Sequence, residues 1–303
     1  MSEYFYEYIQ GLVKEGKVLK DEPLSKHTTF KVGGPADYFI IPGNLKELAG
    51  LISYLNKTGR EYFILGKGSN LLVGDHGYRG VVINILDTLN DIRVVGEEIH
   101  VYAGALLSKI ANEAQKASLS GFEFAAGIPG SAGGAVIMNA GAYGGEMADI
   151  VTAVHIISKE GELVKLGVND LHFAYRSSIL QKEALTVAAV GYRLKKGDPE
   201  EIRAKMDELK AKRLEKQPLE YPSAGSTFKR PEGYFAGKLI MDAGLGGYSV
   251  GGAQVSKKHC GFVINKGGAT AADIMDLIKD VQERVKLKFG VKLEPEVKII
   301  GEF

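Results

Sequence analysis

The sequence predicts an α+β protein with more than one domain, and three observations support this class. The chain has 303 residues, and a chain of this length usually folds into about two domains. Apolar runs of strand length and amphipathic segments of helical period occur together in every third of the sequence. Glycine is also frequent, with 39 residues, or about 13% against about 7% in an average protein. Because glycine is costly to order, this excess suggests places where the backbone lies close to a bulky ligand.

The first third of the chain predicts a small α+β unit. Residues 1–20 predict an amphipathic helix, with Phe5, Ile9, Leu12 and Val13 on one side. We expect strands at 38–41, 61–65 and 81–86, a helix at 45–57 and a hairpin at 92–101.

The middle third continues with mixed patterns. We expect a helix at 106–119, turns and loops in the glycine-rich tract 121–145, and strands at 151–158 and 185–194. A long charged helix then begins after Asp198, a good N-cap, with Pro199 in its first turn. It ends near Gln217. The change to a Pro/Ser/Gly-rich sequence at 217–226 is the main predicted domain boundary.

The last third predicts a further compact unit. We expect a helix at 235–243 and a strand at 261–265. A final helix opens with Thr270 and Asp273 as a capping box. An apolar strand at 297–300 closes the chain.

Composition excludes several classes of function. There are 38 basic and 37 acidic side chains, so the chain lacks the basic excess of a nucleic-acid binder. One cysteine, Cys260, cannot form an internal disulfide, and the chain is expected in a reducing cytoplasm. The six histidines form no close cluster, so no metal site is expected. Glu3 and Glu7 do not fit a signal peptide, and the uncharged run 124–145 contains too many glycines for a membrane helix.

Two glycine-rich clusters are candidates for cofactor binding. The first follows an apolar strand and contains Gly66, Lys67, Gly68, Ser69 and Asn70. Successive N–H groups in such a turn bind phosphate oxygens, although a plain turn would have the same composition. The second contains Gly127, Pro129, Gly130, Ser131, Gly133, Gly134, Asn139, Gly141 and Tyr143. Its small residues would let the backbone lie against a planar ligand or, alternatively, pack tightly beside a sheet.

Three further positions could carry chemistry. Arg176 lies in a polar patch between apolar segments, where a guanidinium could bind a carboxylate or form only a structural ion pair. Ser226 stands on a glycine turn without a Gly-x-Ser-x-Gly elbow, so a hydrolase nucleophile is disfavoured and a local turn hydrogen bond is the plain alternative. Glu294 and Glu296 lie on one side of an extended segment, and both could be simply solvated.

Taken together, these motifs resemble one family. Residues 29–36 (TFKVGGPA), 66–70 and 127–143, the Arg176 patch, the Ser226 turn and the final Glu-Pro-Glu-Val occur in family order. The chain resembles UDP-N-acetylenolpyruvoylglucosamine reductases, flavoproteins of peptidoglycan synthesis, over residues 20 to 300. The resemblance is to the shorter subtype that lacks a tyrosine-bearing loop.

The resemblance implies a fold and a domain division. It implies two FAD-binding subdomains of the vanillyl-alcohol-oxidase (PCMH) type, at 1–97 and at 98–217 with 291–303, and an α+β substrate-binding domain at 218–290. It implies non-covalent FAD, held by the first cluster at its pyrophosphate and by the second at its flavin, with NADPH as co-substrate. A monomer that acts on small molecules, without nucleic-acid or membrane partners, is expected.

The resemblance also implies the catalytic residues Arg176, Ser226 and Glu296, with Ser226 as proton donor. We expect substrate contacts from Tyr175, Lys229, Tyr234, Gln254 and Ser256. Three positions depart from the common family pattern, namely Arg230 in place of asparagine, Gly246 in place of lysine and Cys260 in place of alanine.

The implied reaction is chemically consistent with these residues. Hydride addition to an enolpyruvyl double bond moves negative charge into the carboxylate, where Arg176 would offset it. Glu296 would help only if protonated or bridged, and Ser226 would donate a proton to the adjacent carbon, aided by Lys229 or another cation. Two rivals remain, a sugar-alcohol or phenol oxidase on the same scaffold and a nucleotide-sugar binding module without flavin. Rapid oxidation in air would favour the first, and a colourless protein the second.

Overall fold

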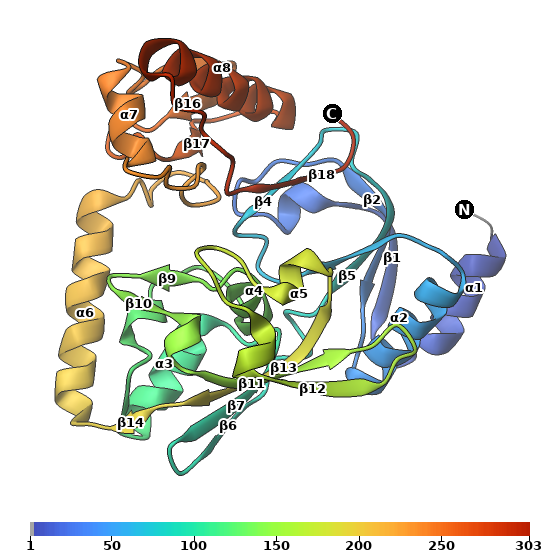
Figure 1. Cartoon of the computed structure of the whole chain (residues 1–303). Coiled ribbons are helices and arrows are strands. Elements are labelled where there is room, and N and C mark those ends of the chain that lie inside the picture. The colour runs from blue at the N-terminus through green and yellow to red at the C-terminus, as the bar shows by residue number, and fades with distance from the viewer. Residues whose placement is uncertain (1–2) are drawn as a thin grey trace. The chain divides into compact units, whose positions relative to one another are not determined.

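The computed structural model describes residues 3–303, which form two compact units (Figure 1). Unit 1 contains the described residues up to 20 together with 38–67 and 80–211. Unit 2 contains 21–37, 68–79 and 212–303. The change of unit between residues 67 and 68 divides the first glycine cluster. The division into three domains stays a prediction.

Unit 1 combines helices with antiparallel strands. Its helices are α1 (Glu3–Leu12), α2 (Leu45–Lys57), α3 (Leu107–Lys116), α4 (Ala132–Ile137) and α5 (Ile179–Lys182). Its strands are β3 (Tyr62–Leu65), β6 (Ile92–Val95), β7 (Glu98–Tyr102), β8 (Leu119–Ser120), β9 (Gly141–Ala142), β10 (Gly145–Glu146), β11 (Val151–Ile157), β12 (Leu163–Gly167), β13 (Thr186–Arg193) and β14 (Lys195–Lys196). Four elements begin in one unit and end in the other, namely β1 (Lys17–Pro23), β2 (Pro35–Ile41), β5 (Tyr78–Asn84) and α6 (Pro199–Lys216).

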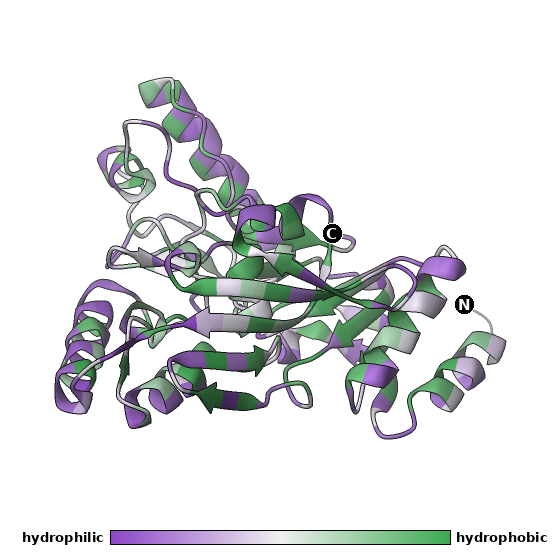
Figure 2. Cartoon of the chain, turned by 60° about the horizontal axis from the view of Figure 1, so that its bottom comes forward, coloured by the Kyte–Doolittle hydropathy of each residue, from purple (hydrophilic) through white to green (hydrophobic). Residues whose placement is uncertain are grey.

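A five-stranded antiparallel sheet is the centre of unit 1. Its order is β12-β11-β13-β7-β6, and every neighbouring pair in it is antiparallel. A four-stranded sheet has the order β1-β2-β5-β3, with β3 and β5 parallel. The apolar residues of α1, α2, α3 and these strands form one continuous core. In the hydropathy colouring, much of the green lies in sheet strands, while the helices alternate purple and green (Figure 2).

Unit 2 has its own apolar core around one long helix. Its elements are β4 (Leu71–Val73), α7 (Ala236–Asp242), β15 (Ser249–Val250), β16 (Ala253–Val255), β17 (Val263–Asn265), α8 (Ala271–Phe289) and β18 (Lys298–Ile300). The apolar face of α8 packs on a small β15-β16-β17 sheet, and β18 pairs in parallel with β4. Thr270 caps α8 through the Asp273 N–H at 3.0 Å, as the capping box predicts. The Asp75 carboxylate accepts the N–H groups of Ala271 (2.8 Å) and Ala272 (2.9 Å) at the same helix end.

Most predicted elements are confirmed within a few residues, but the first helix is wrong in its second half. Helix α1 ends at Leu12, and β1 begins at Lys17. The Glu47 carboxylate accepts the N–H groups of Lys14 (2.8 Å) and Glu15 (2.7 Å). These bonds fix a turn where the hydrophobic pattern predicts continued helix.

Several short elements were not predicted, among them the strands β4 and β12 and the helix α4, which lies in a tract predicted as turns and loops. Gly133 of α4 packs closely on Ala103, whose carbonyl accepts the Gly133 N–H at 2.8 Å. This tertiary contact outweighs the low helix propensity of glycine.

Two properties of the described part of the chain limit its function. Among residues 3–303, no helix is long and apolar enough to cross a membrane. Over the same residues, no group of three or more histidine, cysteine, aspartate or glutamate side chains is arranged to hold a metal ion.

Candidate active site

The two glycine clusters meet in unit 1. Gly66 follows β3 directly, and Ser131 precedes α4. A Cβ atom placed on Gly66 would lie 2.3 Å from the Ser131 Oγ and 3.3 Å from its Cβ. Real Cβ atoms do not approach an oxygen so closely, so only glycine fits at position 66 without a shift. Residues 65 apart in sequence are therefore in direct contact, with Gly66 packed against the Ser131 side chain.

The turn at 66–69 has the character of an anion site. Within the described part of the chain, the backbone N–H groups of residues 66–69 donate no hydrogen bond. Gly68 has a left-handed φ of 63°, and a Cβ there would lie 2.1 Å from the His27 carbonyl oxygen. The Thr29 N–H donates to the Gly68 carbonyl at 3.1 Å, which fixes the turn in unit 2. A glycine-shaped turn with unused donors is suited to phosphate oxygens.

The second cluster lies along the segment after β7. The Ala132 N–H donates to the Ala105 carbonyl at 2.8 Å, and the Leu107 N–H donates to the Gly130 carbonyl at 3.1 Å. Gly133 is buried against Ala103. On the other side of the cluster, backbone is accessible at Gly127, Pro129 and Gly134, which are all exposed.

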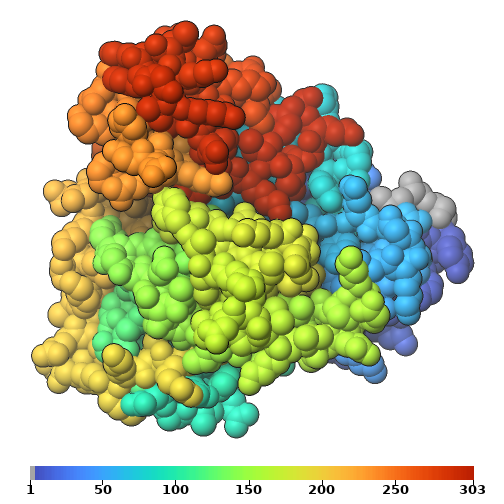
Figure 3. Space-filling view, in the orientation of Figure 1, coloured from blue at the N-terminus to red at the C-terminus, as the bar shows by residue number. Residues whose placement is uncertain are grey.

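Arg176 stands on a tight turn braced from within unit 1. Ala174 and Ser177 exchange backbone hydrogen bonds of 3.0 and 3.1 Å, which places Tyr175 and Arg176 at the tip. Arg176 has a left-handed φ of 52°, which is unusual for a side chain of this size. The segment lies on the surface in the space-filling view, in yellow-green (Figure 3), and 54% of Tyr175 is exposed.

Asn139 connects this turn to the glycine cluster. Its side chain is fully buried, its Nδ2 donates to the Ala174 carbonyl at 3.2 Å, and its Oδ1 accepts the Ala148 N–H at 2.9 Å. The Arg176 Nη2 donates to the Gly141 carbonyl at 3.0 Å. The Asn139 amide thus connects the turn of Arg176 to the segment at Ala148. Tyr143 is exposed on the neighbouring loop, with a φ of 54°.

Ser226 and Glu296 come together in unit 2 although 70 residues separate them. Phe228 and Pro295 form an antiparallel bridge. Next to it, the Glu296 N–H donates to the carbonyl of Thr227 at 2.8 Å. Thr227 is fully buried, and its Oγ1 accepts the Val263 N–H at 2.9 Å. The exposed Ser226 therefore stands at the end of a firmly held segment beside Glu296.

The first glycine cluster also reaches this part of unit 2. The Asn70 Nδ2 donates to the Glu296 carbonyl at 3.0 Å, and the Lys298 N–H donates to the Asn70 carbonyl at 3.1 Å. Asn70, which was predicted as a cofactor residue, thus also holds the strand that carries Glu296. Ser69 is half-buried and Lys67 is exposed.

The predicted substrate residues of unit 2 differ in what they offer a ligand. Tyr234 is 48% exposed. Lys229 forms an ion pair with Glu294 at 3.4 Å, and Gln254 donates to the Ser249 hydroxyl at 3.0 Å. Ser256 is buried, and its Oγ accepts the N–H groups of residues 258 and 259 at 3.2 Å each. The Ser256 hydroxyl oxygen therefore accepts hydrogen bonds within its own loop.

The residues that depart from the family pattern make specific contacts. The Arg230 guanidinium lies 3.9 Å from the ring centroid of Phe235. A Cβ on Gly246 would lie 3.3 Å from the Sγ of Cys260, so these two departures are neighbours. Burial raises the pKa of the Cys260 thiol.

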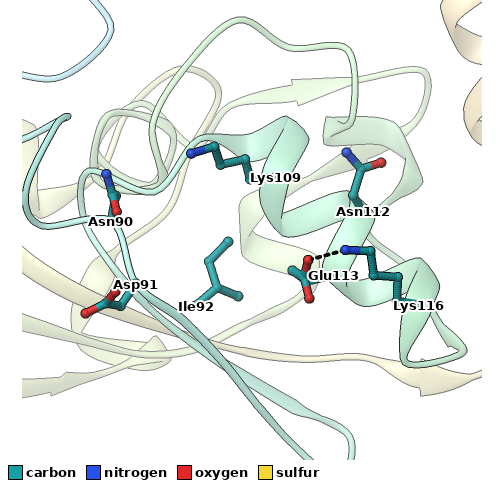
Figure 4. A pocket seen from close by; sticks show the side chains of 7 residues that line it. All are labelled: Asn90, Asp91, Ile92, Lys109, Asn112, Glu113 and Lys116. Atoms are coloured by element: carbon teal, nitrogen blue, oxygen red, sulfur yellow. Dashed lines mark hydrogen bonds and ion pairs between the residues drawn. The ribbon is translucent and has the colours of Figure 1, made fainter.

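A separate hollow in unit 1 contains none of the predicted site residues. It has a volume of about 460 Å³ and lies between α3 and the start of β6 (Figure 4). Lys116 forms an ion pair with Glu113 at 2.8 Å there. Its other lining residues are Asn90, Asp91, Ile92, Lys109 and Asn112.

Comparisons with known proteins agree with this geometry. An FAD binding domain family matches residues 36–167, and the family "UDP-N-acetylenolpyruvoylglucosamine reductase, C-terminal domain" matches residues 217–300. UDP-N-acetylenolpyruvoylglucosamine reductases of Agathobacter rectalis and Caldanaerobacter subterraneus are 53% and 52% identical to the chain, with full coverage of both sequences in each case.

Solved structures show the same relationship. The reductase of Thermus caldophilus is 37% identical and has a TM-score of 0.81, covering 94% of this chain and 98% of that one. A 4-ethylphenol oxidase from Gulosibacter chungangensis has a TM-score of 0.50 at 17% identity, covering 64% of this chain and 43% of that one, and shows the shared fold alone.

These findings define the class of protein first. The FAD binding domain, the PCMH-type fold and the match to the reductase C-terminal domain family make the chain an FAD-containing oxidoreductase. More specifically, the chain belongs to the UDP-N-acetylenolpyruvoylglucosamine reductase family.

Sequence reasoning missed the residues that hold the site together. Thr29 was only part of the family resemblance, yet its Oγ1 donates to the Ser223 carbonyl at 2.6 Å while its N–H binds Gly68. Ser178 is buried and donates to the Ile137 carbonyl at 2.6 Å. Nothing local in the sequence marks these two side chains, because their hydrogen-bond partners lie far away in sequence.

Proposed function

We propose that this protein reduces the enolpyruvyl group of UDP-N-acetylglucosamine enolpyruvate to give UDP-N-acetylmuramate, with NADPH as electron donor. The pairing of the Ser226 segment with the Glu296 segment supports the proposal, because the backbones of the predicted proton donor and of a predicted catalytic residue lie on neighbouring segments. Identity above 50% over the full length of reductases from other bacteria supports it. The single cysteine supports a cytoplasmic protein, and a monomer is our expectation.

The residues present fit FAD. The unused N–H groups of 66–69 would bind its pyrophosphate. The accessible backbone of 127–134 would lie against the flavin ring. Reduced FAD supplies the hydride for the enolpyruvyl double bond.

In this proposal Arg176 binds the substrate carboxylate. Its guanidinium has the planar geometry that binds carboxylates in a bidentate manner. The braced turn at 174–177 limits the movement of the side chain's base, and this preorganisation lowers the cost of binding. A lysine at this position would keep the positive charge but could not form the two parallel hydrogen bonds of a guanidinium.

Ser226 donates the proton to the carbon next to the carboxylate. Its exposed hydroxyl stands on a turn where Gly225 has a φ of 77°. Glu296, on the paired segment, supports the developing charge if it carries a proton. Serine is a weak acid, so a nearby cation must stabilise the oxygen that has lost its proton.

Rapid kinetics of Ser226→Ala tests the proposal. We expect anaerobic flavin reduction by NADPH to remain within about twofold of wild type, while reoxidation by the enolpyruvyl sugar slows by about 10²- to 10⁴-fold, the usual contribution of a positioned acid. Ser223→Ala, three residues earlier, serves as the matched control and should behave as wild type. Equal losses in both half-reactions would contradict a proton-donor function for Ser226.

A further inference from the structure

Asn139 follows helix α4 in a backbone conformation that most often selects glycine. Its φ is 45°, in the left-handed region. The Ala140 N–H donates to the Ala135 carbonyl at 2.8 Å, and the Asn139 N–H donates to the Val136 carbonyl at 3.1 Å. This pair of bonds is the Schellman arrangement, in which glycine is the commonest residue at the left-handed position and asparagine an occasional one. The backbone alone therefore does not explain why an amide side chain stands here.

The side chain of Asn139 is fully buried and joins two other segments of unit 1. Its Oδ1 accepts the Ala148 N–H at 2.9 Å, and its Nδ2 donates to the Ala174 carbonyl at 3.2 Å. The same Ala174 carbonyl accepts the Ser177 N–H at 3.1 Å, which closes the turn that carries Arg176. The amide of Asn139 is thus bonded to the residue at which this turn begins.

The guanidinium of Arg176 is bonded to the same short segment. Its Nη2 donates to the Gly141 carbonyl at 3.0 Å, two residues after Asn139. Because the N–H groups of a guanidinium lie in one plane, such a bond restricts how that plane can turn. Arg176 itself has a left-handed φ of 52°, a conformation that persists in a non-glycine residue only when its surroundings support it. Residues 139–141 therefore hold both the backbone and the guanidinium of Arg176.

We propose that Asn139 is a positioning residue for Arg176, which holds the turn at 174–177 so that the guanidinium meets the carboxylate of the enolpyruvyl group in its binding orientation. This inference rests on the proposed function, which supplies the substrate and the role of Arg176. The sequence predicts Asn139 as a cofactor residue, so a hydrogen bond from its amide to FAD is the competing interpretation. The two interpretations differ in which ligand binds more weakly when the amide is removed.

Asn139→Gly removes the amide and suits the left-handed backbone, so it tests the side chain alone. A double-mutant cycle with Arg176→Met shows whether Asn139 acts through Arg176. The control is Asn56→Ala, which removes an amide that donates to Ile52 and Tyr62 in another part of unit 1.

The cycle is measured on the purified holoenzymes. Their visible absorbance gives the FAD content, and the change in the oxidised flavin spectrum gives the dissociation constants of the enolpyruvyl sugar and of UDP-N-acetylglucosamine. UDP-N-acetylglucosamine has the diphosphate but no carboxylate, so it reports on the parts of the substrate that Arg176 does not bind in this proposal.

We expect Asn139→Gly to bind the enolpyruvyl sugar about 5- to 10-fold more weakly, as the loss of one hydrogen bond implies. In the Arg176→Met background the same change should weaken binding by less than about twofold. Binding of UDP-N-acetylglucosamine and FAD content should stay near wild type, as should all three quantities in Asn56→Ala. Equal weakening in both backgrounds or for both sugars, loss of FAD, or unchanged binding in Asn139→Gly would overturn the inference. Failure of the wild-type enzyme to bind or reduce the enolpyruvyl sugar would instead overturn the proposed function.

Asn139→Asp tests the bond to Ala174 by its pH dependence. The new carboxyl keeps an acceptor for the Ala148 N–H, but it can donate to the Ala174 carbonyl only when it is protonated, and burial favours the protonated form. The affinity of this variant for the enolpyruvyl sugar, relative to that of the wild-type enzyme at the same pH, should therefore rise between about pH 9 and about pH 6. A relative affinity that does not change with pH would also overturn the inference.

Discussion

The contact between Gly66 and Ser131 allows a quantitative test of how the two glycine clusters meet. In Gly66→Ala the new Cβ would lie 2.3 Å from the Ser131 Oγ. Ser131 is only 2% exposed, so its hydroxyl has little room to turn away. Overpacking of a buried site costs about 1 to 3 kcal/mol. We therefore expect Gly66→Ala to lower the free energy of unfolding by this amount and to weaken FAD binding.

The second substitution of the cycle removes the cause of the clash. Ser131→Ala deletes the Oγ, and its side chain makes no helix-capping hydrogen bond, so alone it should change stability by less than about 1 kcal/mol. In the double variant the closest remaining contact is 3.3 Å, to the Cβ of residue 131. The two substitutions should then couple by about 1 to 2 kcal/mol in the favourable direction.

Urea unfolding and FAD titration of the four proteins measure this coupling. Unfolding gives the stability difference, and the rise of flavin fluorescence in the free cofactor gives its affinity. Strictly additive effects in both assays would refute the reasoning, because they would show that residues 66 and 131 do not touch.

Three further substitutions test other parts of the structure. Tyr192→Phe should leave the free energy of unfolding unchanged or raise it by about 1 kcal/mol, because among the described residues the buried Tyr192 hydroxyl has no hydrogen-bond partner. If urea unfolding instead shows a free energy of unfolding lowered by more than about 1 kcal/mol, this hydroxyl makes a hydrogen bond in the folded protein. Asp75→Ala should cost about 1 to 2 kcal/mol, because its carboxylate accepts two N–H groups at the start of α8; thermal unfolding checks this, and an unchanged midpoint would contradict it. The third substitution, at His259, tests the pH dependence of stability. Burial lowers the pKa of His259 in the folded protein, so on acidification the unfolded chain binds the proton first. The free energy of unfolding should therefore fall as pH drops below about 6.5, by at most about 1.4 kcal/mol per pH unit. The His259 Nδ1 accepts the Gly261 N–H at 3.1 Å, and His259→Asn keeps an acceptor for this group. The variant should show a weaker pH dependence of the free energy of unfolding in urea. If this free energy changes equally with pH in both proteins, groups other than His259 cause the dependence.

The sequence predicted those parts of the fold whose cause is local. The capping box at Thr270 and Asp273 and the cap at Asp198 are confirmed, because each involves residues three or fewer apart. The helix at Leu45–Lys57 follows from an uninterrupted apolar stripe and an Asn44 cap. Beyond Leu12 the first helix fails because Glu47, more than 30 residues away, binds the backbone of the turn.

In the candidate site too, local motifs could be predicted and contacts between distant segments could not. Motif order identified the family and the segments of the site. The sequence could not show that Gly66 packs on Ser131, that Asn139 holds the turn of Arg176, or that Lys229 pairs with Glu294. Each is a contact between distant segments, which periodicity and spacing do not encode. The assignments of Arg176, Ser226 and Glu296 stay predictions, and kinetics must decide them.

An absorption spectrum of the purified protein under anaerobic conditions tests the central claim most directly. We expect a yellow protein with flavin absorbance that bleaches when NADPH is added and recovers when the enolpyruvyl nucleotide sugar follows. A colourless protein, or a bleached flavin that recovers in air but not with the enolpyruvyl sugar, would contradict the proposed reaction.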